Sequence, residues 1–174
     1  ARDELALALP CLLAQPVPLV DAVQGDGALI AGTPASSPLI AALDLGADLA
    51  AAGDEGYVLV RTRSDGRDCV AVAANTDIGV LYGVFAFLRL LQTHRPLNGL
   101  HVVSAPKIRL RMLNHWDNLD RTVERGYAGF SLWDWHKLPD YLDPRYTDYA
   151  RANASIGINA ASLTNVNANA LILT

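Results

Sequence analysis

Between Asn114 and Asp143 the chain gathers the residue types best suited to chemistry. All three of its tryptophans, Trp116, Trp133 and Trp135, lie there beside carboxylates and arginines. Flat aromatic faces next to charged hydrogen-bonding groups suit a polar ligand that also has an apolar face. A sugar is such a ligand, so this segment is the first candidate for a binding site. The alternative is that the tryptophans only pack a core or a domain junction.

The charged residues of this segment allow more than one role. Arg121 and Arg125 each have the fork geometry that binds a carboxylate, although an ion pair to Asp120 or Glu124 within the segment is the alternative. Glu124 and Asp117 are of the type needed for glycoside hydrolysis, but acids in a long loop are more commonly structural caps. His115, Asp117 and His136 match no metal-ligand spacing, so no metal is expected.

The elements around this segment predict how it is held. Ile108–Leu113 is predicted as a strand, with Asn114 and His115 at its end, aimed at the mouth of a site. A loop of nearly thirty residues follows, then a helix with Asp143 as its cap and Gly157 at its end. Residues 161–163 form a second strand that leads to Asn165. This strand, loop, helix and strand open a (β/α)₈ TIM barrel, which needs about 250 residues, so residues 106–174 are predicted to be an incomplete catalytic domain.

Residues 1–105 are predicted to form a separate α+β domain, a mostly antiparallel sheet with helices on one face. Ser104-Ala105-Pro106 marks the boundary. Asp65-Gly66 predicts a hairpin turn, and Gly79 and Gly83 allow one helix to approach the sheet closely. The expected helices begin at residues 1, 38 and 77, with Pro10 ending or kinking the first, and the expected strands cover 28–33, 56–63, 69–74 and 100–103.

Composition excludes several classes of function. The net charge of −4 and the absence of a basic run argue against nucleic-acid binding. The longest apolar run, residues 78–91, is too short to span a bilayer and contains Arg89, so no membrane insertion is expected. Cys11 and Cys69 fit no zinc pattern, and two buried free thiols are favoured over a disulfide. Asp3 and Glu4 stand where a secretion signal would carry lysines, so any signal is absent or removed.

A resemblance covers nearly the whole chain. RMLNHWDNLDRTVERGYAGFSLWDW and YARANASIGINAASLTNVNA, together with the upstream AANTDIGVLYGVFAFLRLLQ, resemble the α-glucuronidases of glycoside hydrolase family 67. The resemblance implies an N-terminal domain similar to the one that precedes the barrel in β-hexosaminidases. It implies a parent enzyme, often a homodimer in this family, that hydrolyses α-1,2-linked (4-O-methyl)glucuronic acid from glucuronoxylan-derived oligosaccharides with inversion. No cofactor is implied, and a periplasmic or extracellular location is slightly favoured over a cytoplasmic one.

The same resemblance implies ligand contacts but no catalytic residue in this chain. The family's catalytic acid and base lie beyond Thr174, so the fragment alone is expected to be inactive. The substrate contacts carried over from the HWDN and ERGYAG motifs, the first loop and the second strand are Trp116, Asp117, Asn118, Glu124, Arg125, Trp133 and Asn165. A non-catalytic carbohydrate-binding module and a structural docking domain are the alternatives.

Overall fold

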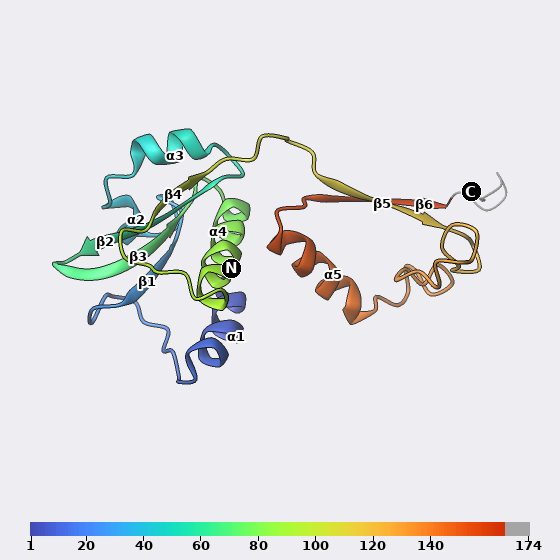
Figure 1. Ribbon diagram of the computed structural model, residues 1–174, viewed down its shortest axis with the longest axis horizontal. Coiled ribbons are helices and arrows are strands. Elements are labelled where there is room, and N and C mark those ends of the chain that lie inside the picture. The colour runs from blue at the N-terminus through green and yellow to red at the C-terminus, as the bar shows by residue number, and fades with distance from the viewer. Residues whose placement is uncertain (166–174) are drawn as a thin grey trace. The chain divides into compact units, whose positions relative to one another are not determined.

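Residues 1–165 are described by the computed structural model, in which the chain forms two separately organised units, Ala1–Lys107 and Ile108–Thr174 (Figure 1). The first unit is built around a four-stranded sheet, and the second around a two-stranded one. The candidate site lies in the second unit.

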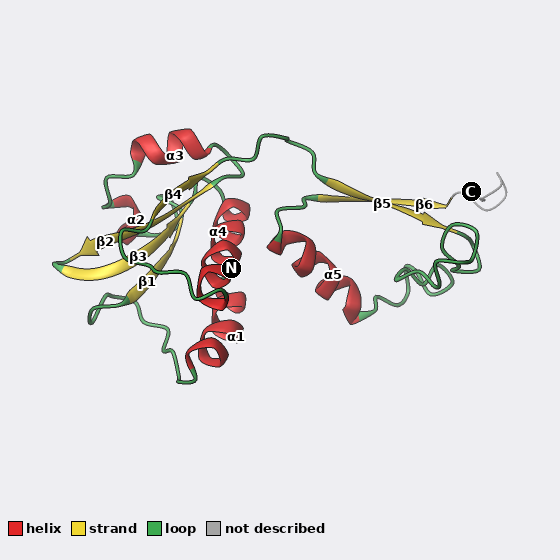
Figure 2. Cartoon of the chain, viewed as in Figure 1, coloured by secondary structure: helices red, strands yellow, loops and turns green. Residues whose placement is uncertain are grey.

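The sheet of the first unit is mostly antiparallel, as the sequence predicts. Its strands have the order β1-β3-β2-β4, in which β1 pairs parallel with β3 and the other two pairings are antiparallel (Figure 2). The β2–β3 turn is closed by Asp65 and Gly66, whose φ angles of 50° and 77° give the left-handed pair that suits the twist of a hairpin. The strands are β1 (Ala28–Gly32), β2 (Tyr57–Ser64), β3 (Arg67–Ala73) and β4 (His101–Ser104).

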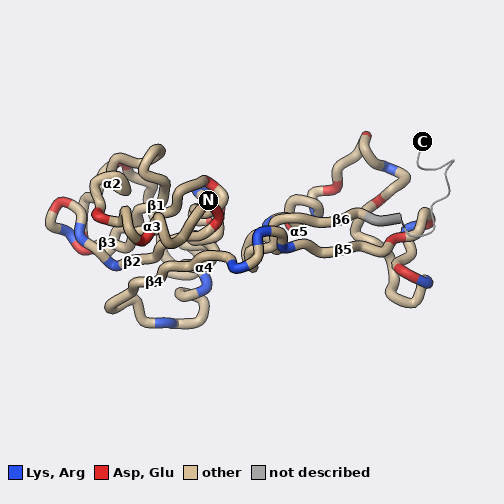
Figure 3. The backbone as a smooth tube through the Cα atoms, turned by 90° about the horizontal axis from the view of Figure 1, so that it is seen from above, with Lys and Arg blue, Asp and Glu red and all other residues tan. Residues whose placement is uncertain are grey.

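Charges of opposite sign meet on the β2–β3 hairpin (Figure 3). The guanidinium groups of Arg61 and Arg63 lie 3.3 Å and 3.0 Å from the Asp68 carboxylate. Hydrogen bonds from Arg63 and then Arg61 lower the pKa of Asp68. These exposed arginines are therefore partly neutralised by a neighbour on the adjacent strand.

Helices cover both faces of this sheet, so the prediction of helices on one face was wrong. α1 (Arg2–Leu13) and α4 (Asp77–Gln92) pack with Leu59 and Val72, whereas α2 (Pro38–Ala41) and α3 (Gly46–Ala52) pack with Val58 and Ala71. Neighbouring residues along each strand are thus buried on opposite sides. Consecutive apolar residues in a strand are typical of a sheet covered on both faces, and this was the signal overlooked.

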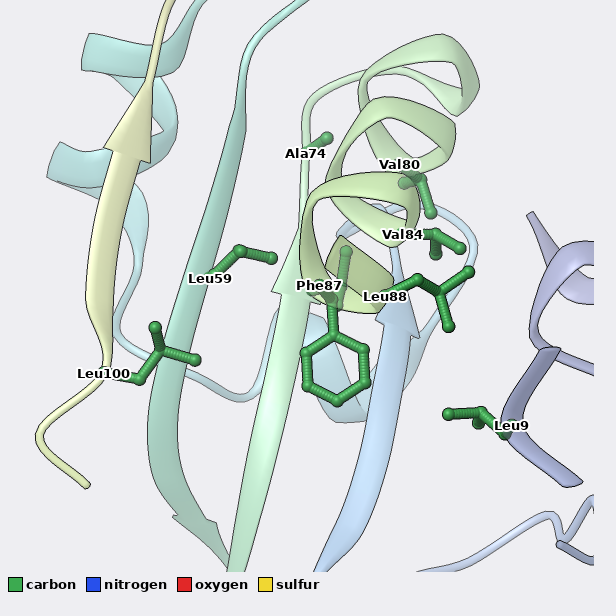
Figure 4. Close-up of a cluster of buried hydrophobic side chains, with 9 residues drawn as sticks. Leu9, Leu59, Ala74, Val80, Val84, Phe87, Leu88 and Leu100 are labelled. Atoms are coloured by element: carbon green, nitrogen blue, oxygen red, sulfur yellow. The ribbon is translucent and has the colours of Figure 1, made fainter. Parts of the chain in front are cut away.

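α4 lies close to the sheet because two of its glycines leave room for it. A Cβ added at Gly79 would come within 2.5 Å of the Gly56 carbonyl oxygen, and one at Gly83 within 2.7 Å of a Val72 methyl. The Thr76 side chain accepts a hydrogen bond from the Gly79 amide and caps the helix. Both the close approach and the helix start are confirmed. The cluster beneath α4 is built from buried side chains that include Leu9, Leu59, Val80, Val84, Phe87, Leu88 and Leu100 (Figure 4).

Pro10 does not end α1, which was one of the two effects predicted for it. The helix continues through this residue to Leu13, although proline has no amide hydrogen to donate within the helix. Leu9 is buried in the core cluster and holds this turn in place. Both cysteines are free, but Cys11 on α1 is exposed and only Cys69 is buried, so the prediction of two buried thiols was half wrong. None of the helices within residues 1–165 combines the length and the apolar character that a membrane span requires.

The second unit is a parallel strand-helix-strand unit, as predicted. β5 (Met112–Asp117) pairs with β6 (Ala160–Asn165), and α5 (Pro144–Ser155) connects them. The Asp143 side chain accepts a hydrogen bond from the Arg145 amide and caps α5. Gly157 follows the helix with a φ of 77°, a conformation that favours glycine.

β5 begins four residues later than predicted, so the expected strand at Ile108–Leu113 was misplaced. The Arg111 guanidinium donates to the carbonyl oxygens of Gly157 and Ile108, and the Arg111 amide donates to the Asn159 side chain. Ahead of the strand ladder, Arg111 is therefore held by these side-chain contacts and by backbone hydrogen bonds from the Asn159 and Ala160 amides to its carbonyl oxygen. As a result, Trp116 and Asp117 belong to the strand and not to the loop after it.

Candidate functional site

Alternate residues of β5 face opposite sides of the two-stranded sheet. His115 faces α5: its Nε2 lies 2.6 Å from the Tyr149 hydroxyl, and its ring meets the Trp133 ring edge-on at 5.7 Å. Trp116 therefore lies on the opposite face, and its side chain is 50 % exposed. The expectation that His115 points toward the mouth of a site was wrong, because the strand turns it toward the helix.

Asp117 ends the described strand with a buried carboxylate. The residue is 1 % exposed, and its Oδ2 accepts hydrogen bonds from the Ser131 hydroxyl and, at 3.0 Å, from the Trp135 indole N–H. The Ser131 oxygen in turn accepts a hydrogen bond from the Trp133 amide at 2.9 Å. Direct contact between Asp117 and a ligand stays a prediction, and in this conformation the carboxylate is turned toward the loop.

A second buried carboxylate, Asp134, holds the far part of the loop. Its Oδ2 lies 3.1 Å from Arg121 and 3.2 Å from Lys137, and the Asp134 amide donates to the Tyr146 hydroxyl of α5. Arg121 also donates to the Ser131 carbonyl oxygen. Arg121 therefore forms an ion pair within the loop, as the alternative interpretation had it, but its partner is Asp134 and not Asp120 or Glu124.

Trp133 packs among aromatic side chains of β5 and α5. Its ring centroid lies 4.7 Å from that of Tyr146 and 5.5 Å from that of Tyr149. Among residues 1–165, its buried indole N–H has no hydrogen-bond partner. The ring thus joins the loop to the helix, and its contact with a ligand stays a prediction.

An open hollow of about 480 Å³ lies at the start of the loop. This volume falls in the range of small-molecule sites. Three of the predicted contact residues, Asn118, Glu124 and Arg125, are brought together here. Asn118 donates to the Thr122 hydroxyl at 2.8 Å and to the Glu124 carbonyl oxygen at 2.6 Å, so it braces the wall. The hollow is lined by Asn118, Leu119, Asp120, Thr122, Glu124 and Arg125.

The electrostatics of the hollow leave one cation available. The Arg125 side chain is exposed and has no ion pair with any residue of the described range 1–165. The Glu124 carboxylate accepts a hydrogen bond from Tyr127, and this bond raises the pKa of the Tyr127 hydroxyl. Arg125 is therefore free to bind an anionic group of a ligand, whereas Arg121 is not.

The acidic residue Asp120 acts as a turn cap. Its Oδ1 accepts hydrogen bonds from the Thr122 amide at 2.9 Å and from the Thr122 hydroxyl at 2.6 Å, and these bonds lower the pKa of Asp120. Sequence reasoning did not select Asp120, Thr122 or Ser131 for the site. The Asp-x-Thr pattern, typical of a side-chain-capped turn, was the signal that could have identified the first two.

The last predicted contact, Asn165, lies opposite Asp117 in the register of β5 and β6. Its backbone ends the described part of the chain, and its side chain lies outside the described residues. At Asp117 and Asn165 the two parallel strands therefore lie side by side next to the loop, and a ligand contact of Asn165 stays a prediction.

Comparisons with known proteins match both parts of the chain to one family. Residues 1–87 match the model of the glycosyl hydrolase family 67 N-terminus, and residues 90–174 match that of the family 67 middle domain. The chain is 41 % identical over 111 residues to the probable alpha-glucuronidase A of Aspergillus oryzae, covering 62 % of this chain and 13 % of that protein. It is 39 % identical over 127 residues to the alpha-glucuronidase A of Emericella nidulans, covering 70 % of this chain and 14 % of that protein. The chain thus spans about a seventh of the length of these relatives.

Proposed function

This chain belongs to glycosyl hydrolase family 67, and on that basis we propose that it is the N-terminal portion of an α-glucuronidase. The complete enzyme removes α-1,2-linked glucuronic acid, or its 4-O-methyl ether, from xylooligosaccharides with inversion of configuration. The names of the relatives support this activity, and the family matches argue against the carbohydrate-binding module and the docking domain. The resemblance further supports a homodimer of the complete enzyme.

The proposal includes the architecture that would hold the substrate. We take residues 1–105 as an N-terminal domain of the hexosaminidase type and 106–174 as the first part of a TIM barrel. The parallel pairing of β5 and β6 around α5 supports this, because such a unit is the repeating element of a barrel. The catalytic acid and base belong to later barrel strands, so none of the residues described here carries the proton transfers.

The substrate portion recognised by this chain is the uronic acid. Arg125 binds its carboxylate, Glu124 and Asn118 border the hollow, and Trp116 offers its exposed indole face to a sugar ring. The observation that carries this assignment is that Arg125 lines an open hollow without an ion pair among residues 1–165. A planar guanidinium matches a carboxylate through two parallel hydrogen bonds.

The experiment that tests the assignment replaces Arg125 in the full-length enzyme. Arg125→Ala is expected to lower kcat/KM on aldouronic acids. The corresponding loss of transition-state stabilisation should be about 1.5–3 kcal/mol, the contribution of a hydrogen bond to a charged group. Arg125→Lys keeps the charge but loses the two-pronged geometry, so it should recover only part of the loss. Arg67→Ala is the matched control, because Arg67 is also an exposed arginine but lies on the hairpin of the first unit.

Two outcomes separate the parts of the proposal. If wild-type enzyme releases no glucuronic acid from aldouronic acids, the proposed activity is wrong. If wild-type enzyme is active and Arg125→Ala has unchanged kinetics, the activity holds but Arg125 does not belong to the uronate site.

A further inference from the structure

The loop after β5 adopts a backbone conformation that needs support. Arg121 and Glu124 have φ angles of 71° and 56°, in the left-handed region that side chains other than glycine rarely adopt. Arg125 follows directly, so the position of its side chain depends on this backbone. Residues in such conformations persist only when surrounding contacts fix them. The contacts that fix this backbone include those of the Asp117 carboxylate.

Asp117 reaches this backbone through Ser131. The Ser131 hydroxyl donates to the Asp117 carboxylate, while the Ser131 amide donates to the Arg121 carbonyl oxygen at 2.7 Å. One residue thus ties the buried carboxylate to the first strained position. The second is tied to β5 itself, since the Glu124 amide donates to the Trp116 carbonyl oxygen at 2.6 Å.

The second donor to Asp117 fixes the return of the loop. Trp135 lies eighteen residues further along the chain, and its indole N–H is bonded to the same Oδ2 as the Ser131 hydroxyl. A buried carboxylate is stable only when such donors replace its lost hydration. Both donors come from one loop, so loop closure and the burial of this charge depend on each other.

We propose that Asp117 is a positioning residue, whose buried carboxylate clamps the loop through Ser131 and Trp135 and thereby holds Glu124 and Arg125 at the hollow. The inference rests on the proposed function only for the identity of the substrate. It assigns Asp117 a role that differs from contact with the sugar, because the clamp occupies the carboxylate and leaves it 1 % exposed.

Hydrogen exchange tests the clamp without any substrate. In the full-length protein, Asp117→Ala should speed amide exchange in peptides covering residues 118–135 at least tenfold, while α5 and the first unit keep their rates. Trp135→Phe and Ser131→Ala keep Asp117 and remove one donor each, so they should give smaller increases in the same peptides. Unchanged exchange in all three variants would overturn the proposal, even if the enzyme proved to have another activity.

Kinetics on an aldouronic acid separate positioning from direct contact. A clamp predicts that Trp135→Phe raises KM about tenfold with a smaller change in kcat, the effect of one lost hydrogen bond to a charged group. It also predicts that the double variant Asp117→Ala, Trp135→Phe has the same KM as Asp117→Ala alone. Asp117→Ala already removes the hydrogen bond that Trp135→Phe removes, so the second change has nothing further to break. Additive effects of the two changes, or a wild-type KM for Trp135→Phe, would place Asp117 on the substrate instead and overturn the inference.

Discussion

Replacing Gly79 by alanine should destabilise the first unit, even though alanine is the better helix former. In the middle of a helix this exchange stabilises by about 1 kcal/mol, and because Gly79 lies in the first turn of α4 this value is the upper bound for the gain. At Gly79 the new Cβ would meet the Gly56 carbonyl oxygen at 2.5 Å and the Ala74 Cβ at 2.8 Å. Neither atom belongs to a flexible side chain, so α4 itself must shift away from the sheet.

The size of the effect follows from these two opposing contributions. Overpacking a core by a methyl-sized group costs about 1–3 kcal/mol, and a clash with main chain lies at the upper end. After the helix-propensity gain is subtracted, the free energy of unfolding should fall by about 1–2 kcal/mol. Gly46→Ala is the control: Gly46 begins α3, and a Cβ added there would meet no atom within 4 Å, so the change should be neutral or slightly stabilising.

Urea unfolding followed by far-ultraviolet circular dichroism measures this difference. Tryptophan fluorescence would not serve, because Trp116, Trp133 and Trp135 all lie in the second unit. A Gly79→Ala protein as stable as wild type, alongside the expected behaviour of Gly46→Ala, would contradict this prediction. Such a result would mean that α4 can move from the sheet at no cost.

Two further predictions concern the thiols and the activity of the chain alone. In native protein a thiol reagent should modify Cys11 quickly and Cys69 only on unfolding. Cys69 is buried, and this burial raises the pKa of its thiol. Equal modification rates for the two thiols would contradict the packing of β3. Residues 1–174 alone should release no glucuronic acid from aldouronic acids, since the proposed catalytic carboxylates are absent. Turnover by the purified chain, with a mock preparation as control, would instead require the catalytic carboxylates to lie within it.

Local signals in the sequence predicted most secondary structure correctly. Ser37, Thr76 and Asp143 each precede a helix and accept a hydrogen bond from its first turn, and Asp65-Gly66 forms the expected turn. Such signals involve residues only a few positions apart, so they can be recognised without knowing the fold. α3 was missed because its Ala-rich segment buries only Leu49 and Ala52, which gives little periodicity.

The candidate site was less predictable because its contacts are long-range. Sequence reasoning selected Asn118, Glu124 and Arg125 together, and the structure brings these three residues to one hollow, while their contact with a ligand stays a prediction. It did not distinguish the exposed Arg125 from the paired Arg121, since that depends on Asp134 thirteen residues away. Nor did it show that the Asp117 carboxylate turns into the loop, which requires knowing where Ser131 returns.

The contacts at the entry to β5 decide which aromatic ring faces which side. Asn159 binds both the Arg109 carbonyl oxygen and the Arg111 amide, so the strands are aligned before their ladder begins at Met112 and Ala160. Because side chains alternate along a strand, a slip of one residue would exchange Trp116 with His115. An indole would then be driven against the helix and an imidazole would replace it on the uncovered face. Arg111 and Asn159 lie before the start of the ladder, away from the hollow. Their contacts thus fix the strand register and thereby which aromatic ring faces the helix.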